Sequence, residues 1–306
     1  MTAMTRWRAA RAARAWCGGG SAGLLLAVLL LLGALPAAAA PALWRYGDED
    51  TTVYLFGTVH LMRADTDWRD ETLDDVLARV DHFVFEVSQE EMNPIVMQQL
   101  VMQKGFLPAG RNLSALLPAA LRQRLKDAAG RYKIPEAALE RMRPWYAALQ
   151  ITVEAARAEG LRPEDGVDVA LMRYAAERGV PSGGLETVAE QLDLFAGLAL
   201  DDEIAFLEGS LDDAARIPEL VARLESAWVD GRVEELAALL AESLDRDPDL
   251  RARLLTDRNR RWVARLKDLL ARPGTHFVAV GAAHLAGPAN VVELLAKDGV
   301  AVERLR

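Results

Sequence analysis

Hydrophobic positions along the chain follow two different patterns. Short runs rich in β-branched and aromatic residues are typical of buried strands. The expected strands are Thr52–Phe56, His82–Val87, Val180–Leu185, His276–Val280 and Gly299–Arg304, the last as an edge strand. Between the first two runs, Leu73, Val76, Leu77 and Val80 recur at helical spacing. A strand, a helix and a second strand in succession predict a parallel sheet.

The middle of the chain has mainly helical periodicity, punctuated by proline and glycine. The expected helices are Pro118–Arg131, Glu136–Glu159, Val167–Arg178, Thr187–Leu198, further segments to about Arg272 that include Pro248–Leu270, and Pro288–Lys297. The pattern therefore predicts an α/β fold. Its central sheet is mostly parallel, with strands from the N- and C-terminal parts and a large helical middle region.

The first 40 residues have the three parts of a secretory signal peptide. Four arginines precede Cys17, an uncharged run spans Leu24–Leu35, and Pro36 is followed by four alanines. This pattern predicts a cleaved leader over residues 1–40, a single domain over residues 41–306, and a periplasmic or secreted protein. The alternative is a retained membrane anchor, because the run from Ser21 to Ala40 has about the 20 residues that cross a bilayer.

Charge and cysteine content limit the partners and the reactive groups that the protein can have. The chain has 36 basic and 45 acidic residues, and the leader contains four of the bases and no acid. The body is therefore strongly acidic, which argues against nucleic acid as a partner. Cys17 is the only cysteine. A mature domain without it has no disulfide, thiolate ligand or cysteine nucleophile.

A Gly-x-x-His sequence occurs twice, each time directly after an expected strand. The first runs from Gly57 to His60 and the second from Gly281 to His284. In an open parallel sheet, ligands bind beyond the carboxyl ends of the strands, so both histidines are expected at one crevice. Each histidine alone is equally typical of a residue that hydrogen-bonds a turn.

Two carboxylates have equivalent positions. Glu86 lies at the end of one expected strand and Glu186 at the end of another. Two imidazoles with one or two carboxylates suffice to bind Zn²⁺, Mn²⁺ or Co²⁺, and a metal-bound water is a nucleophile near neutral pH. The structural alternatives are an ion pair with an arginine for Glu86 and a helix-capping role for Glu186.

The helix expected over Pro248–Leu270 adds two polar candidates. Asn259 lies on the apolar face of this helix and needs a buried partner, either a site carboxylate or the backbone. Its neighbour Arg258 is positioned to neutralise an acid or to hold a substrate carboxylate. Asp168, in the first turn of the helix expected over Val167–Arg178, is either a helix cap or a polar group of the site. His82 and His276 lie at strand starts and are interpreted as structural.

Together these motifs resemble the TraB/GumN family, which includes the pheromone-shutdown protein PrgY and the Tiki proteins. The residues that carry the resemblance are Leu55–His60, Glu86, Gly166–Asp168, Gly184–Thr187, Arg258, Asn259, Trp262, Val280–Leu285 and Gly287. The resemblance covers Leu43 to Arg306. It implies an α/β fold in which the two histidine motifs face one site.

The Tiki branch of this family implies a divalent-metal-dependent peptidase. By resemblance, His60, Glu86 and His284 match the catalytic or metal-binding positions most directly. The first hypothesis is an exported metal-dependent hydrolase acting on a peptide or another small substrate. In it, His60, His284, Glu86 and Glu186 ligate the metal, with Glu86 also a candidate general base, and Arg258 stabilises charge. The alternatives are a non-catalytic binding protein for peptide, metal or haem, and a structural partner in an envelope assembly.

Overall fold

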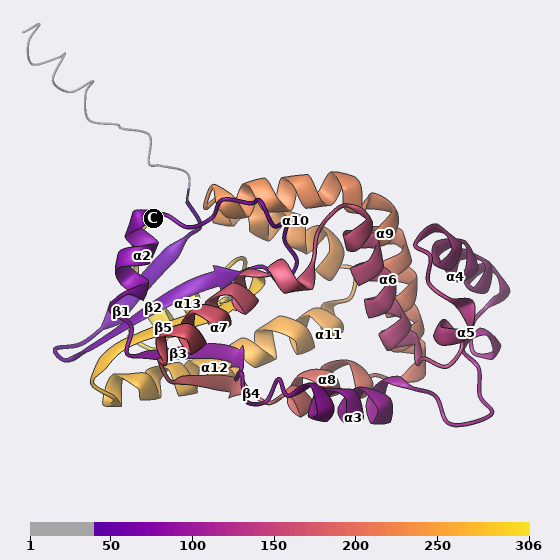
Figure 1. Cartoon of the computed structure of the whole chain (residues 1–306), viewed down its shortest axis with the longest axis horizontal. Coiled ribbons are helices and arrows are strands. Elements are labelled where there is room, and N and C mark those ends of the chain that lie inside the picture. The colour runs from indigo at the N-terminus through magenta and orange to yellow at the C-terminus, as the bar shows by residue number, and fades with distance from the viewer. Residues whose placement is uncertain (1–39) are drawn as a thin grey trace, which may run out of the picture. The chain divides into compact units, whose positions relative to one another are not determined.

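Six strands form one sheet in the order β4-β3-β5-β2-β1-β6. The computed structural model describes residues 40–306, so the predicted leader lies outside the described residues. The strands are β1 (Leu43–Gly47), β2 (Thr51–Thr58), β3 (His82–Val87), β4 (Ser182–Glu186), β5 (Gly274–Gly281) and β6 (Glu303–Arg304). The neighbours β4, β3, β5 and β2 are parallel, whereas β1 is antiparallel to β2 and to β6. This mixed, mostly parallel sheet confirms the predicted α/β class (Figure 1).

The two faces of the sheet have separate apolar cores because successive strand residues point to opposite sides. On one face, Phe83 and Phe277 pack with α2 (Glu71–Leu77) and α7 (Val167–Arg178). On the other, their chain neighbours Val84 and Val278 pack with α12 (Asp257–Lys267) and α13 (Val291–Lys297). The parallel strands are therefore buried on both faces, which explains their nearly continuous apolar sequences.

A third core joins the helices Ala119–Arg131, Glu136–Leu139, Pro144–Ala158 and Leu200–Val229. The helices of the middle region lie beside the sheet in Figure 1, beyond the ends of its parallel strands. They are α3 (Pro94–Gly105), α4 (Ala119–Arg131), α5 (Glu136–Leu139), α6 (Pro144–Ala158), α8 (Val188–Ala196), α9 (Leu200–Val229), α10 (Val233–Leu244) and α11 (Pro248–Arg251). Among the helices of residues 40–306, none is long and apolar enough to cross a membrane.

Several expected elements have different bounds. The single helix expected over Glu136–Glu159 is two helices, because Pro144 starts a new one at a position that needs no N–H donor. The helix expected over Pro248–Leu270 is interrupted by a π-helical segment, Ala252–Thr256, between α11 and α12. The last strand contains only two residues, and the sequence pattern did not predict β1 or α3.

Strand register brings the carboxyl ends of four parallel strands to one edge. Thr58 of β2 is paired with Gly281 of β5, and Val87 of β3 with Glu186 of β4. The polar groups that follow these strands therefore meet at this edge, where the helical middle region covers it.

Truncation of one buried side chain on the central strand β5 tests the packing of this core. Phe277 of β5 is fully buried and contacts Phe56 and Phe83. We expect Phe277→Ala to lower the free energy of unfolding by about 3–5 kcal/mol, measured by urea denaturation. Ile95→Ala is the control, because Ile95 is 66% exposed and its loss should change the free energy by less than about 0.5 kcal/mol. An equal effect of the two substitutions would contradict the assignment of the core.

Candidate functional site

Four polar side chains stand in a row along the carboxyl edge of the parallel strands. In the order of the sheet they are Glu186 at the end of β4, Glu86 near the end of β3, His284 after β5 and His60 after β2. Arg258 reaches this row from α12. The structure thus brings together all five residues that the sequence singled out.

Arg258 bridges the two glutamates. Its Nη2 donates to Glu86 Oε2 at 2.5 Å and to Glu186 Oε1 at 2.5 Å, and its Nε donates to Glu186 Oε2 at 3.2 Å. All three side chains are almost fully withdrawn from water, with exposed fractions of 7%, 10% and 5% for Arg258, Glu86 and Glu186. Buried charges are stable only when paired in this way. The arginine therefore neutralises acids of the protein itself.

Gln191 completes the contacts of the carboxylates and was missed by sequence reasoning. Its Nε2 donates to Glu86 Oε2 at 3.0 Å and to Glu186 Oε1 at 3.2 Å. A capping box between Thr187 and Glu190 starts α8 and places Gln191 one turn into the helix, beside the glutamates. The N-cap of α8 is therefore Thr187, and the helix-capping alternative considered for Glu186 is wrong.

His284 is held as one tautomer. Asn259 donates through Nδ2 to the carbonyl of Ala289, so its Oδ1 faces the imidazole and accepts from His284 Nδ1–H at 2.6 Å. The second ring nitrogen, Nε2, therefore carries a lone pair, which accepts from Arg258 Nη1 at 3.0 Å. Of the two partners expected for Asn259, the backbone is confirmed, whereas the site group that it bonds is the imidazole of His284 and not a carboxylate.

The protonation of the buried site follows from its surroundings. Burial, reinforced by the charge of Arg258, lowers the pKa of His284 to about 3, although Glu86 opposes this shift. Burial alone would raise the pKa of Glu86, but His284, Arg258 and the backbone N–H of Gly281 favour its charged form and lower it. At neutral pH the site therefore holds a neutral imidazole beside a carboxylate, with 3.8 Å between His284 Nε2 and Glu86 Oε1.

His60 has a different environment. Its ring is 59% exposed and lines a large pocket, and its Nδ1 lies 3.3 Å from Asp168 Oδ2. Partial withdrawal from water lowers the pKa of His60, but the hydrogen bond that the ring donates to Asp168 and the charge of Glu86 outweigh this effect and raise it. The helix-capping alternative for Asp168 is wrong, because its side chain makes no cap hydrogen bond to α7. Asp168 instead orients His60.

The glycines of both motifs are required by close contacts. A Cβ on Gly281 would lie 3.1 Å from Glu86 Oε1, 3.4 Å from His60 Nε2 and 3.7 Å from His284 Cδ2. These three groups therefore converge on the backbone of Gly281, whose N–H donates to Glu86 Oε1 at 2.7 Å. A side chain at this position would therefore press on the carboxylate of Glu86, the nearest of the three groups.

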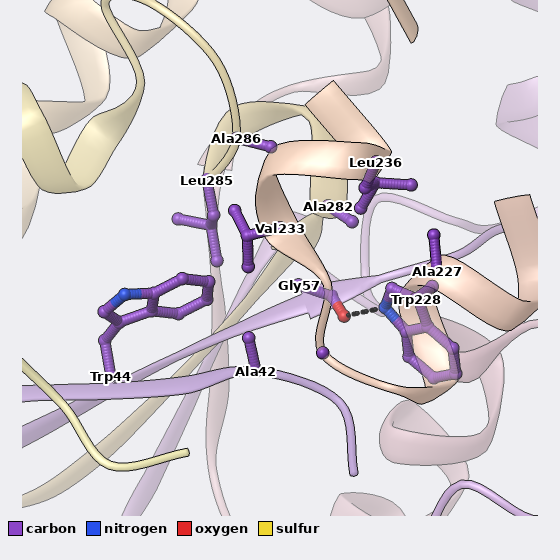
Figure 2. A pocket seen from close by; sticks show the side chains of 11 residues that line it. Ala42, Trp44, Gly57, Ala227, Trp228, Val233, Leu236, Ala282, Leu285 and Ala286 are labelled. Atoms are coloured by element: carbon purple, nitrogen blue, oxygen red, sulfur yellow. Dashed lines mark hydrogen bonds between the residues drawn. The ribbon is translucent and has the colours of Figure 1, made fainter. Parts of the chain in front are cut away.

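Gly57 has the matching role in the first motif. A Cβ there would lie 3.0 Å from Cα of Ala282, inside the second motif, so glycine lets the two turns pack directly. Figure 2 shows Gly57 beside Ala282, with its carbonyl accepting a hydrogen bond of 2.8 Å from Trp228 Nε1. Trp228 comes from α9, and this bond therefore fixes the motif to the helical region as well.

The π-helical segment before α12 also serves the site. The carbonyl of Leu254 within this segment accepts from Arg258 Nη1 at 3.0 Å. Trp262, one turn further on, stacks near both the guanidinium (4.6 Å to the ring centroid) and the His284 ring (4.3 Å between centroids). The irregular turn therefore helps to position the buried cation, as π segments often do at functional sites.

His60, Glu86, Gln191, Arg258 and His284 line one end of a pocket of about 630 Å³. Most of its other walls are apolar side chains from the helical middle region. Glu186 does not line this pocket, because it lies behind Arg258 and borders a separate, more polar hollow. The groups that can reach a bound molecule are thus the two histidines, Glu86, Gln191 and Arg258.

The donor types suit a divalent cation, but their spacing is that of a hydrogen-bonded cluster. Neutral imidazole nitrogen and carboxylate oxygen are good ligands of Zn²⁺, Mn²⁺ and Co²⁺, and Asn259 is the kind of partner that orients a ligating histidine. Arg258 engages the lone pair of His284 and both glutamates. Across residues 40–306, no three acidic or histidine side chains are arranged around one point as ligands.

The remaining two histidines lie at the opposite end of the sheet. His82 and His276 are paired in register at the starts of β3 and β5, with 6.0 Å between ring centroids. His276 Nε2 lies 2.8 Å from the carbonyl of Arg272. Their position away from the carboxyl edge agrees with the structural interpretation.

Comparisons with known proteins give three relatives at low identity. YbaP of Escherichia coli K12, an uncharacterised protein, is 28% identical over 151 residues, which cover 49% of this chain and 55% of YbaP. YbaP of Shigella flexneri matches equally. The metalloprotease TIKI2 of Danio rerio is 25% identical over 301 aligned residues, which cover 82% of this chain and 58% of TIKI2. The matches therefore span little more than half the length of these relatives. No solved structure is significantly similar.

The family is identified over nearly the whole described chain. Residues 42–304 match the TraB/PrgY/gumN family, and this range contains both histidine motifs, the glutamates and Arg258. The chain therefore belongs to the TraB/PrgY/gumN family.

Proposed function

We propose that this protein is an exported hydrolase that activates water at the carboxyl edge of its sheet, and that it cleaves peptide bonds with the help of a divalent metal ion. The observation that carries the proposal is the convergence of His60 Nε2, Glu86 Oε1 and the His284 ring on Gly281, at one end of a large pocket. Similarity to a relative named as a metalloprotease supports the choice of reaction.

His60, His284 and Glu86 are the proposed metal ligands, and Mn²⁺, Co²⁺ and Zn²⁺ are the candidate ions. When bound, such an ion lowers the pKa of a water molecule and polarises a carbonyl. The second carboxylate, Glu186, is proposed to act as a fixed counter-charge to Arg258, because it does not line the pocket.

The side chains of this site can carry out the remaining steps. Glu86, ionised at neutral pH, is placed to accept a proton from water, and Gln191 and Gly281 orient its carboxylate. His60 is the most accessible candidate, since its ring is 59% exposed, and Asp168 keeps a proton on Nδ1 so that Nε2 faces the site. Arg258 supplies positive charge beside the position where a carbonyl would become negative.

Export is proposed from the leader pattern of residues 1–40, with the domain acting in the periplasm or outside the cell. Fractionation of cells that express the full chain tests it against a variant lacking residues 1–40. Equal distribution of both forms in the cytoplasm would contradict export. A full-length form that stays in the membrane at its uncleaved mass would show instead that the leader is a retained anchor.

Metal content is the first test of the proposed chemistry. We expect residues 41–306 to bind about one equivalent of Mn²⁺, Co²⁺ or Zn²⁺ in elemental analysis, and His60→Ala and His284→Ala each to lose it. His82→Ala is the matched control, because His82 lies at the other end of the sheet and its loss should leave metal content unchanged. Peptide cleavage by the loaded protein should stop on chelation.

If the wild-type protein binds no ion under any loading condition, the metal-dependent mechanism is contradicted. Purification with a Soret absorption band would point instead to the alternative of a haem-binding protein. Peptide binding that survives chelation without any turnover would favour a non-catalytic peptide receptor.

The buried charges give a prediction on stability. Arg258→Met leaves two glutamates buried without their cation, and we expect it to lower the free energy of unfolding by about 3–5 kcal/mol. Arg260→Met is the control on the same helix, because Arg260 is 65% exposed and its exposed ion pair contributes at most about 1 kcal/mol. Adding Glu186→Gln to Arg258→Met should recover part of the loss. Full stability of Arg258→Met would refute the bridging role.

Asp168 gives a prediction on pH dependence. Because Asp168 raises the pKa of His60, we expect Asp168→Asn to lower it, measured by NMR titration of the imidazole in metal-free protein. The chain has four histidines, so the variant His60→Ala identifies the resonance. Asp165→Asn is the control, since Asp165 lies three residues away and is not paired with His60. An unchanged pKa in Asp168→Asn would exclude the positioning role.

A further inference from the structure

The pocket at the site is apolar over most of its depth. Helices α6, α8, α9 and α10 and the π-helical segment supply aliphatic and aromatic walls, among them Leu149, Phe195, Leu224, Leu240 and Leu254. Its volume of about 630 Å³ is in the middle of the range of roughly 300–1,000 Å³ found for small-molecule sites. We call this part of the pocket the apolar chamber. It has room for much more than one amino-acid side chain.

Polar groups that could serve a ligand lie at one end only. Away from the strand ends, the chamber is lined by two polar side chains, Thr152 and Glu225. The Thr152 hydroxyl donates to the carbonyl of Ala148, and Glu225 accepts from Arg63 and Thr66. Both are already paired. A peptide backbone threaded through the chamber would lose its hydrogen bonds with water at a cost of about 1–3 kcal/mol for each unpaired group. A hydrocarbon chain has no such cost.

The charges at the polar end limit the head group. Glu86, Glu186 and Asp168 are opposed by Arg258 and, when it is protonated, by His60. In the metal-free protein the acids are in excess, so a free carboxylate or phosphate is disfavoured there. A neutral carbonyl adds no charge to this end of the pocket, where Arg258 and Gln191 already donate to groups of the protein.

From these observations we propose that the substrate carries a long aliphatic acyl chain. The chain occupies the apolar chamber, and its neutral ester or amide carbonyl lies among His60, Glu86 and Arg258. This inference rests on the proposed hydrolytic site, and it assigns to that site an acyl ester or amide in place of a peptide. In the reaction, water oxygen bonds to the acyl carbon, the bond from that carbon to the ester oxygen or amide nitrogen breaks, and a proton from water passes to the leaving group. The products are a fatty acid and an alcohol or an amine.

Binding is measured first, without catalysis. Metal-free residues 41–306 are loaded with the neutral dye Nile red, and methyl esters and N-methyl amides of 4-, 8- and 12-carbon acids are added below the concentration at which they aggregate. We expect affinity to rise roughly fifteenfold for each two methylene groups, the fold-change that corresponds to about 0.8 kcal/mol per buried CH₂. The free acids should bind more weakly than the esters, and an acetylated tetra-alanine amide should not displace the dye.

Two variants localise the binding. Leu224→Trp and Leu240→Trp place bulk into the chamber from half-buried positions, and each should weaken binding of the 12-carbon ester at least tenfold. Leu200→Trp is the matched control on the same helix as Leu224, because Leu200 is exposed and does not line the chamber. Circular dichroism and urea unfolding of each variant show whether weaker binding occurs in a folded protein. Two filling positions are used so that the test stands if one of the two variants does not fold.

The outcomes distinguish this inference from the proposed function. Affinity that does not depend on chain length, or that is unaffected in both folded filling variants, overturns the chamber assignment even if the protein cleaves peptides. Length-dependent binding without cleavage of the esters or amides by metal-loaded protein supports the chamber and contradicts the hydrolase. Cleavage of the ester series or the amide series alone identifies which acyl bond is the substrate.

Discussion

The pairing of one buried arginine with two buried glutamates is the constraint on which the site depends. Glu86 and Glu186 end neighbouring strands, and without Arg258 two like charges would share one desolvated edge of the sheet. The same guanidinium donates to His284 and is itself held by the carbonyl of Leu254. The position of the helix α12, the ionisation of Glu86 and the orientation of His284 are therefore coupled. None of them can change without disturbing the others.

The two histidine motifs are alike in sequence but unlike in physical state. His284 is buried, neutral and fixed by Asn259, whereas His60 is open to the pocket and paired with Asp168. Such a division suits a site in which one imidazole keeps a fixed lone pair and the other exchanges a proton with a bound molecule. The difference arises from the elements that cover each motif, since α12 packs over the second and the pocket opens over the first.

Sequence patterns predicted the parallel strands and the strand-end residues because both depend on short-range signals. An apolar run that ends in glycine and histidine indicates both the strand and the edge at which its polar residue lies. The partners of those residues were harder to find. Nothing local in the sequence pairs Arg258 with Glu86, 172 positions away, and Gln191 resembles any surface glutamine of an amphipathic helix. Asp168 had the signature of a helix cap, yet the backbone turn beside His60 gives it another partner.

The apolar chamber shows why a cavity in the helical middle region could not be predicted from the sequence pattern. An amphipathic helix shows only that one face is covered, and it does not reveal whether that face meets a neighbouring helix or an enclosed space. Leu149, Leu224 and Leu240 are spaced as core residues are, and in the structure they line a cavity of about 630 Å³. The polar groups lie at the sheet edge, whereas the helices form the walls of the pocket and so limit which molecules can reach these groups. In the proposed hydrolase, chemistry and selectivity are thus assigned to different parts of the fold, so relatives that share the strand-end motifs would be free to differ in substrate through changes in these helices alone.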